Sequence, residues 1–308
     1  MSEVMRAAAF AEAGGPEVLK VMELPAPQAG QGQVRVRVRA AGVQPFDTAV
    51  RAGWLPPYLP EMPFPRIPGN EFAGVVDQVG AGVTGVSAGD EVLGFSALHS
   101  YAEYVVVPAT DVAPKPPGLP WEAAGGLTAG VQTAELAIDG LGLADGETLL
   151  VHAAAGAVGT AAVQIARRRG ATVIGTAREA NHDYLRDLGA VPVEYGEGLA
   201  DRVRELAPGG VDAALDGAGG HALEVSIELV KDRRRIITMV EHAKAPGLGV
   251  QVVQGVRTSE RLGRYAALVA AGAFAWPVRR AYALEDAAQA HREVEARHGQ
   301  GKIVLRVP

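Results

Sequence analysis

Two kinds of hydrophobic pattern divide this chain. Near its start, Val34, Val36 and Val38 alternate with arginines, which is the period of a half-buried β-strand. Further short apolar runs, separated by glycine and proline, lie at 72–79, 91–95 and 102–107. Several short strands punctuated by turns predict a small, barrel-like β domain.

Beyond a proline-rich segment at 108–120, strand patterns alternate with helical patterns. The predicted strands occupy 148–152, 171–175, 191–195, 211–216 and 235–240. Helical patterns fall between them, notably at 160–169, 199–206 and 222–230. This alternation predicts a parallel sheet with right-handed crossovers. A helix near 284–296 and a strand at 302–307 follow, and we expect that strand to return to the β domain.

The turn between the first two of these strands carries the most specific motif. Its positions Ala154, Gly156 and Gly159 stand where a dinucleotide-binding unit has the three glycines of G-x-G-x-x-G. Gly156, Ala157 and Val158 would face a pyrophosphate at the helix N-terminus. Gly159 would let the helix pack against the strand. The strand, turn, helix and second strand predict a dinucleotide site although Ala154 departs from the strict pattern.

The end of the second strand indicates which dinucleotide binds. A site for NADH has an acidic residue about 20 residues after the turn, on the ribose 2′-hydroxyl. Here the chain reads Thr176-Ala177-Arg178, and a guanidinium in place of a carboxylate suits a 2′-phosphate. We therefore predict NADPH, with Thr176 and Arg178 among its contacts. Alternatively, Arg178 is a solvated residue at a helix end, beside Glu179.

Composition narrows the functional classes. The 308 residues have a net charge of −6, which gives no electrostatic basis for binding nucleic acid or an anionic membrane. The sequence shows no signal peptide and no apolar run near 20 residues, so we expect a cytoplasmic protein that does not enter a membrane. Cysteine is absent and no paired-histidine motif occurs, so we expect no metal site.

The chain resembles the medium-chain dehydrogenase/reductase superfamily, and within it the zinc-independent, zeta-crystallin-like NADPH:quinone oxidoreductases. The resemblance covers nearly the whole chain. The motifs that carry it lie at 41–47 (AGVQPFD), 68–76 (PGNEFAGVV), 79–92, 151–159 (VHAAAGAVG) and 301–305 (GKIVL).

This resemblance implies an α/β fold of two domains. A GroES-like β-barrel catalytic domain would occupy residues 1–120 and be completed by about 275–308. A Rossmann domain with a doubly wound parallel sheet would occupy 121–274, with the active site in the cleft between the two domains. The family also implies a homodimer formed by pairing the edges of the Rossmann sheets.

The resemblance also indicates a zinc-free site. Zinc-dependent relatives have Cys where this chain has Gln44 and His where it has Asn70, and the lobe of four cysteines is absent. Without a metal to lower the pKa of an alcohol, reduction of an activated acceptor is favoured over alcohol oxidation. The family motif Gly-Leu-Thr reads Gly130-Val131-Gln132 here, which places a longer amide among the expected nicotinamide contacts.

Further candidate residues follow partly from the ends of strands, where open α/β sheets bind ligands, and partly from what the family resemblance implies. The additional cofactor contacts that we expect are Tyr195, Gly217, Met239, Val240, Val253 and Lys302. Tyr195 is alternatively a strand-end aromatic residue, and Lys302 a surface lysine on an edge strand. Asp216 is expected to be structural.

The catalytic candidates are Gln44, Asp47, Tyr58 and Lys302. Gln44 would hydrogen-bond the substrate carbonyl, and Asp47 matches a family position near the cleft but alternatively caps a helix. Tyr58 and Lys302 are candidate proton donors. Trp54, Tyr58 and Phe64 lie in a proline-rich loop that forms either a flat apolar wall for the acceptor or ordinary loop packing.

These features predict an enzyme that uses NADPH to reduce a small-molecule quinone or α,β-unsaturated carbonyl by hydride transfer. Amide and backbone N–H groups would stabilise the charge that develops on oxygen. Two alternatives remain: reduction of an enoyl thioester or prenyl-type enone, and a cofactor-binding regulatory protein with little turnover.

Overall fold

The computed structural model describes residues 3–56, 59–296 and 299–308. The chain forms two compact units. Unit 1 comprises Met1–Ala129, Thr258–His298 and Lys302–Pro308, and unit 2 comprises Gly130–Arg257 and Gly299–Gly301. The described residues contain no helix that is both long and apolar enough to cross a membrane.

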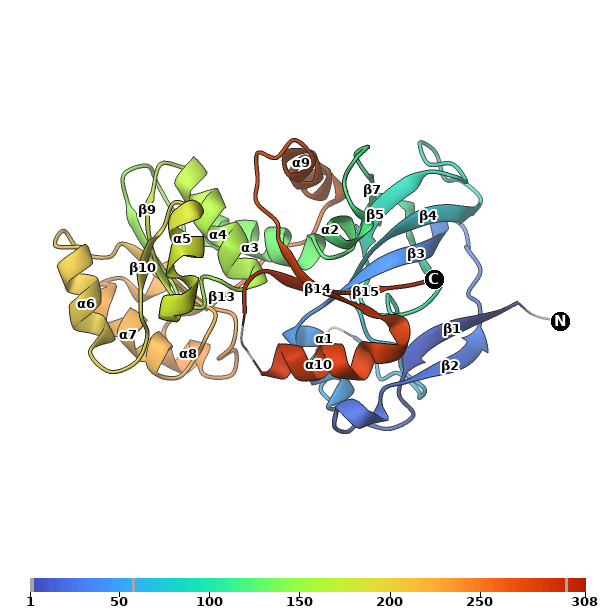
Figure 1. Cartoon of the computed structure of the whole chain (residues 1–308), viewed down its shortest axis with the longest axis horizontal. Coiled ribbons are helices and arrows are strands. Elements are labelled where there is room, and N and C mark those ends of the chain that lie inside the picture. The colour runs from blue at the N-terminus through green and yellow to red at the C-terminus, as the bar shows by residue number, and fades with distance from the viewer. Residues whose placement is uncertain (1–2, 57–58, 297–298) are drawn as a thin grey trace. The chain divides into compact units, whose positions relative to one another are not determined.

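Unit 1 is built on an antiparallel sheet in the order β14-β15-β3-β4-β5-β7, with β6 also paired to β3 (Figure 1). Among the described strands of this sheet, β14 and β15 pair in parallel and the other neighbours pair antiparallel. The strands are β1 (Val4–Ala9), β2 (Lys20–Pro25), β3 (Gln33–Val43), β4 (Glu71–Val79), β5 (Glu91–Phe95), β6 (Tyr104–Pro108), β7 (Val112–Pro114), β14 (Val278–Ala283) and β15 (Lys302–Arg306). The helices are α1 (Pro45–Arg51), α2 (Trp121–Gly125), α9 (Ser259–Ala270) and α10 (Ala287–Glu295).

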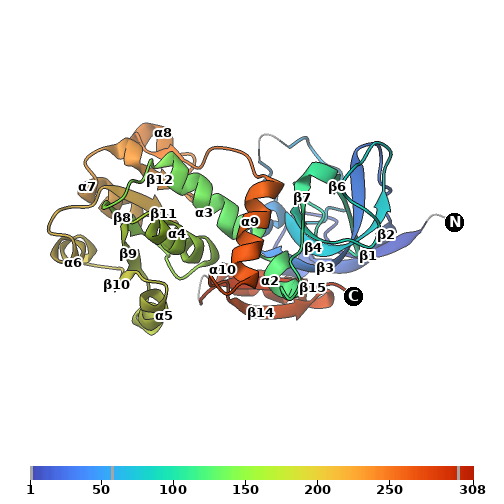
Figure 2. The same cartoon turned by 90° about the horizontal axis from the view of Figure 1, so that it is seen from above.

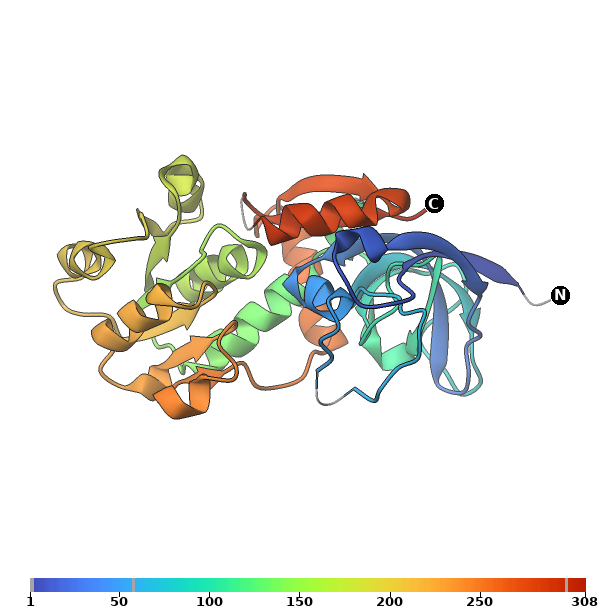
Figure 3. The same cartoon turned by 90° about the horizontal axis from the view of Figure 1, so that it is seen from below.

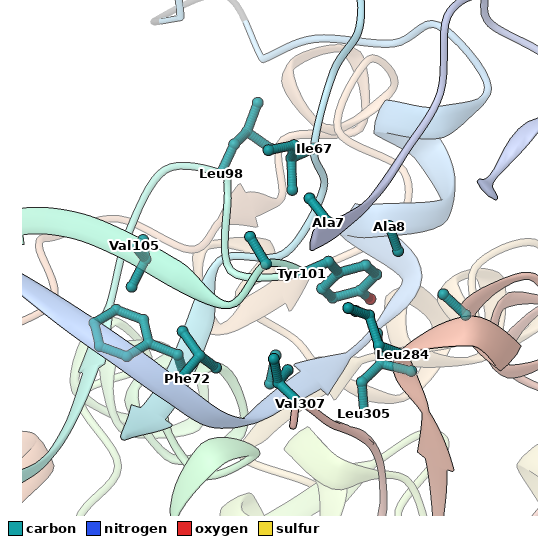
Figure 4. Close-up of a cluster of buried hydrophobic side chains, with 14 of the residues drawn as sticks. Ala7, Ala8, Ile67, Phe72, Leu98, Tyr101, Val105, Leu284, Leu305 and Val307 are labelled. Carbon is teal, nitrogen blue, oxygen red and sulfur yellow. The ribbon is translucent and has the colours of Figure 1, made fainter. Parts of the chain in front are cut away.

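The alternation that predicted β3 has a direct structural cause. Val34, Val36 and Val38 are fully buried in the core of unit 1, because successive side chains of a strand point to opposite faces. In this core, the ring of Tyr101 lies among small and aliphatic side chains that include Ala7, Ala8 and Leu284 (Figure 4). α10 packs along α1 beside the core (Figure 3).

β15 completes the sheet of unit 1. It pairs antiparallel with β3, with Val304 opposite Gly42 and Leu305 opposite Ala41. β14 lies on its other side, so β15 is an interior strand. This confirms the expectation that the last strand returns to the β domain.

Unit 2 contains a six-stranded parallel sheet in the order β10-β9-β8-β11-β12-β13. Its strands are β8 (Thr148–Val151), β9 (Thr172–Thr176), β10 (Val191–Val193), β11 (Ala213–Asp216), β12 (Ile236–Thr238) and β13 (Gln251–Val252). Its helices are α4 (Ala157–Arg168), α5 (His182–Asp187), α6 (Leu199–Leu206), α7 (His221–Leu229) and α8 (Ala245–Leu248), and α3 (Thr128–Gly140) leads into it.

The strand order of unit 2 reverses beside β8. From β8 the chain proceeds to β9 and β10 in one direction, and then from β11 to β13 in the other. α4 packs on β8 and β9, whereas α7 packs on β11 and β12 and against α6 (Figure 2). Right-handed crossovers in opposite directions give a doubly wound sheet, in which ligands bind where the order reverses. The predicted α/β class is confirmed.

Candidate functional site

The turn after β8 carries the first group of candidate residues, which belongs to unit 2. The chain turns at Ala153, whose φ of 56° is rare for a residue other than glycine. Gly156 is the N-cap of α4, and Ala157 and Val158 are its first two residues, so their N–H groups have no partner within the helix. A Cβ added to Gly156 would meet only the carbonyl oxygen of Ala153, at 3.4 Å. The turn therefore leaves open space at a helix N-terminus, which suits an anionic group such as a pyrophosphate.

The other two motif positions are packed instead of open. A Cβ on Gly159 would lie 2.5 Å from Ala153 O and 2.6 Å from Ala154 Cα, so only glycine lets α4 sit against the turn. Ala154 is fully buried, and a Cβ on Gly175 of β9 would lie 2.9 Å from its methyl group. Gly175 thus provides the room that lets alanine replace the first glycine of the motif.

A buried hydrogen-bond chain holds this turn. Ser226 Oγ donates to Ala222 O at 3.0 Å, so the Nε2–H of His152 donates to Ser226 Oγ, also at 3.0 Å. The Nδ1 of His152 then faces Thr176 Oγ1 at 3.4 Å, and Ala153 N donates to that same oxygen at 3.3 Å. Burial lowers the pKa of His152 to about 4. The imidazole ring is therefore neutral, as its place in this series of hydrogen bonds requires.

Asp216 ends β11 and organises the adjacent loop. Its Oδ1 accepts hydrogen bonds from the backbone N–H groups of Ala218 and Gly219, and its Oδ2 accepts one from Thr238 Oγ1 at 2.7 Å. These three hydrogen bonds go to its own loop and to β12, which is the arrangement of a structural residue. Gly217 is closely packed, because a Cβ there would lie 3.0 Å from His152 O.

Arg178 and Tyr195 meet after the ends of neighbouring strands. Arg178 Nε donates to Tyr195 Oη at 3.0 Å, and both residues are exposed. No carboxylate stands at Ala177, the position expected to carry one in a site for NADH. The prediction that Tyr195 ends its strand is wrong, because β10 stops at Val193 and Tyr195 lies in the loop beyond. That loop position is what lets its hydroxyl reach Arg178.

The remaining cofactor candidates of unit 2 lie on β12, β13 and α3. Met239 and Val240 follow β12 directly instead of ending it, since the strand stops at Thr238. Val253 follows β13 and is half-buried, and Gln132 is fully buried on α3.

A separate group of candidate residues lies in unit 1, where the ends of three adjacent strands meet at one edge of the sheet. Gln44 follows the end of β3, Asn70 precedes the start of β4, and Lys302 begins β15. β4 and β15 flank β3 and both run antiparallel to it, so these three residues share one edge. Antiparallel pairing therefore brings together residues that are up to 258 positions apart.

A buried chain of polar contacts links these residues. Lys302 Nζ forms an ion pair with Glu71 Oε1 at 2.5 Å and donates to Gln44 Oε1 at 2.6 Å. Gln44 Nε2 donates to Asn70 Oδ1. The other oxygen of Glu71 accepts from Ala129 N at 2.6 Å. Lys302 is 2% exposed and Glu71 is 0% exposed, so water does not screen this pair.

Asp47 lies behind Gln44 on the first turn of α1. Its Oδ2 accepts from Gln44 N at 3.0 Å and from Tyr101 Oη at 2.9 Å, so the carboxylate caps the helix as one alternative expected. Burial raises the pKa of Asp47 to about 7, although Lys302 and Tyr101 pull it in the other direction. Burial and the neighbouring Asp47 raise the pKa of Tyr101 well above its usual value.

One expectation about unit 1 is overturned. The alternative that Lys302 is a surface lysine on an edge strand is wrong, because β15 is interior and the ammonium is buried. In the proline-rich loop, Trp54 is 50% exposed and packs edge-on against Phe46, and Phe64 packs against Phe10. Tyr58 of that loop lies outside the described residues.

Sequence reasoning gave no role to Glu71, Tyr101 or the His152 chain. Glu71 lies beside Asn70 in a recognised motif, and its place at the start of an apolar strand was an available signal for a buried charge. Nothing in the sequence signals Tyr101 as a partner of Asp47. Among residues 3–56, 59–296 and 299–308, no three His, Asp or Glu side chains gather as a metal site would require.

Comparison with known proteins shows the family to which this fold belongs. Residues 30–117 match the alcohol dehydrogenase GroES-like domain, and residues 188–305 match a family described as zinc-binding dehydrogenase. A quinone oxidoreductase of Pseudomonas aeruginosa is 34% identical over 96% of this chain and 98% of its own length. The chain therefore belongs to the quinone oxidoreductase branch of the medium-chain dehydrogenase/reductase superfamily, as its motifs predicted.

Two other relatives show how far the similarity extends. The rat synaptic vesicle membrane protein VAT-1 homolog is 36% identical over 73% of this chain but only 56% of its own length, so this chain spans little more than half of that relative. The structure of Escherichia coli quinone oxidoreductase complexed with NADPH is 28% identical, with a TM-score of 0.84 over 98% of this chain and 99% of that one.

Two glycine variants should separate packing from ligand space in the turn. Gly159→Ala forces a Cβ against backbone atoms, and overpacking of this kind costs about 1–3 kcal/mol, so Tm should fall by several degrees. Gly156→Ala should keep the native Tm but weaken dinucleotide binding, because its methyl fills open space. Calorimetry and cofactor titration measure the two effects, with Gly209→Ala as the control because nothing lies within 4 Å of its Cβ. A native Tm for Gly159→Ala would contradict this assignment.

The pKa of Asp47 makes stability depend on pH in a defined direction. An unfolded aspartate titrates near pH 3.9, and folded Asp47 titrates at about 7, so between these values only the folded state holds the proton. This contribution is fully present below pH 4 and is lost as the pH rises through 7.

Asp47→Asn cannot release that proton, and it keeps an oxygen for Gln44 N and Tyr101 Oη. Its stability relative to the native protein should therefore rise between pH 4 and 7, by on the order of a few kcal/mol, and level off above about pH 8. Urea unfolding at a series of pH values measures the difference. A difference that stays constant from pH 4 to 8 would show that Asp47 titrates normally.

Proposed function

We propose that this protein is a zinc-independent, NADPH-dependent oxidoreductase that reduces a quinone or an α,β-unsaturated carbonyl. The observation that carries the proposal is the pair Gln44 and Asn70, which stand at the two positions where zinc-dependent relatives have Cys and His. Their amides are hydrogen-bonded to each other, and the amide oxygen of Gln44 also accepts from Lys302. Amide groups are poor zinc ligands but good partners for a carbonyl oxygen.

The residues of unit 2 fit a nicotinamide dinucleotide. The open space at Gly156 and the N–H groups of Ala157 and Val158 suit the pyrophosphate. Arg178 and Tyr195 together offer a cation and a hydroxyl for a 2′-phosphate. The complex of the E. coli relative with NADPH supports the same choice. We place Thr176, Gly217, Met239, Val240, Val253 and Gln132 among the further contacts of the cofactor.

When bound, the nicotinamide supplies a hydride to an electron-poor carbon of the acceptor, and one proton completes the reduction. Gln44 supplies an N–H donor to the acceptor oxygen, which becomes negative as the hydride arrives. Asp47 holds Gln44 in place through its backbone N–H, so we assign it a positioning role. Tyr58 is our candidate for the proton donor.

Two further properties are part of this proposal. We propose a homodimer and a cytoplasmic location, and both rest on the family resemblance. Trp54 and Phe64, whose rings are half-exposed in the proline-rich loop, supply an apolar surface for a flat acceptor.

The activity itself is tested by following NADPH absorbance with a panel of 1,4-quinones, enones and enoyl thioesters. We expect turnover with quinones or enones, and no loss of rate after dialysis against a zinc chelator. Turnover confined to enoyl thioesters would favour the second function predicted from the sequence. Cofactor binding without turnover on any acceptor would instead favour a regulatory protein.

The preference for NADPH is tested at Arg178. Charge-assisted hydrogen bonds contribute about 1.5–3 kcal/mol, so Arg178→Gln should raise the Kd for NADPH by roughly 10- to 100-fold and leave that for NADH unchanged. Arg186→Gln is the matched control, because Arg186 is exposed on α5 and pairs only with Asp183 among the described residues. Equal weakening of both cofactors would contradict a role in 2′-phosphate recognition.

A further inference from the structure

We infer that Glu71 and Lys302 are positioning residues that fix the direction of the Gln44 side-chain amide, so that its N–H group faces the acceptor. Neither residue needs to touch substrate or cofactor for this role. The inference rests on the proposed function. It explains why Gln44 presents a hydrogen-bond donor, and not an acceptor, to the oxygen of the acceptor molecule.

The chemistry of the ammonium group determines the direction of the amide. Lys302 Nζ carries only donors, so the Gln44 atom that lies 2.6 Å from it is the carbonyl oxygen. The reversed amide would place two donors against each other at that distance. Nε2 consequently points away from Lys302, and one of its two N–H groups donates to Asn70 Oδ1. The second N–H of Gln44 has no partner among the described residues, and it is the donor available to a ligand.

Glu71 makes this arrangement possible. A buried ammonium without a counter-ion carries a large desolvation cost, and removing one partner of a buried pair is strongly destabilising. Glu71 Oε1 lies 2.5 Å from Lys302 Nζ, and its Oε2 is fixed by the N–H of Ala129. The carboxylate therefore holds the ammonium at the one place from which it reaches Gln44.

Two glycines leave the space that this pair needs. A Cβ on Gly42 would lie 2.0 Å from Glu71 Oε1, and one on Gly126 would lie 2.8 Å from Lys302 Cγ. Gly42 belongs to β3, where Val304 of the next strand is its partner. The absence of side chains at Gly42 and Gly126 thus leaves space for the side chains of Glu71 and Lys302, at the edge of the sheet where Gln44 and Asn70 lie.

The direction of the amide decides what the site stabilises. Hydride transfer to a quinone or enone leaves negative charge on the acceptor oxygen, which an N–H donor lowers in energy. An amide turned the other way would present oxygen to oxygen and raise that energy. Removing one such donor typically costs 10²–10³ in kcat, so Lys302 and Glu71 influence the rate through Gln44.

The decisive variant is Gln44→Glu. It keeps an oxygen for Lys302 Nζ but replaces the N–H donors with a second oxygen at nearly the same size. We expect kcat with 1,4-benzoquinone to fall by about 100-fold, with the Kd for NADPH changed by less than about threefold. Native kcat in this variant would overturn the inference.

Two further variants test the positioning pair. The double variant Glu71→Gln/Lys302→Met removes both charges together, so it should have a higher Tm than the single variant Lys302→Met, which leaves Glu71 uncompensated. The double variant should lose roughly tenfold in kcat, with little change in Kd for NADPH. Lys20→Met is the matched control, because Lys20 is exposed on β2 and should leave both values unchanged. A double variant with native kcat would overturn the inference.

A spectroscopic measurement does not depend on turnover. The side-chain amide signals of Gln44 in a ¹H–¹⁵N spectrum are identified by their absence from Gln44→Glu. In the native protein these protons should exchange slowly with water, and in the double variant they should exchange at least tenfold faster. Unchanged exchange would refute the positioning role even if the protein proved to be an active reductase. Faster exchange in a protein without turnover would support the positioning role while refuting the proposed function.

Discussion

The pairing of β15 with β3 is the constraint on which unit 1 and its candidate residues depend. Five residues near the end of the sequence enter the sheet between β14 and β3, and Lys302 is the first of them. Because β15 and β4 both run antiparallel to β3, Lys302 and Glu71 arrive at the edge where Gln44 leaves it. A buried ion pair forms there at low dielectric, which makes it strong when complete and costly when broken. We infer that this ion pair sets the orientation of the side-chain amides of Gln44 and Asn70.

In unit 2, the turn after β8 exposes backbone N–H groups while one of its residues has a strained conformation. The left-handed conformation of Ala153 is held by a chain of hydrogen bonds through Thr176, His152 and Ser226. Ala154 replaces a motif glycine without disturbing this turn, because Gly175 of the neighbouring strand leaves room for its methyl group. A departure from the motif in sequence is thus compensated across the sheet, and the open space in front of Gly156 is retained.

The hydrophobic pattern of the sequence predicts most helices and strands but not where each of them ends. β5 and α6 lie at their predicted positions, whereas β10 and β12 stop two residues early, which moves Tyr195 and Val240 from strands into loops. A strand ends where the neighbouring strand no longer forms backbone hydrogen bonds with it. A single sequence does not show where that happens. α9 was not predicted, although Leu262, Tyr265 and Ala266 are buried at helical spacing. The apolar face of α9 is short, and its burial depends on contact with β7, which the sequence pattern alone does not show.

The sequence by itself determined the α/β class and the small-residue turn after β8, and it predicted a zinc-free site at Gln44 and Asn70 and a preference for NADPH from the arginine after β9. These are properties of residue types at fixed local spacing. Only the tertiary structure decided that Lys302 is buried against Glu71, that Tyr101 Oη donates to Asp47, and that Arg178 meets Tyr195. Those contacts join residues 17 to 231 positions apart, and their energies depend on burial and on strand register, which arise when the sheets assemble.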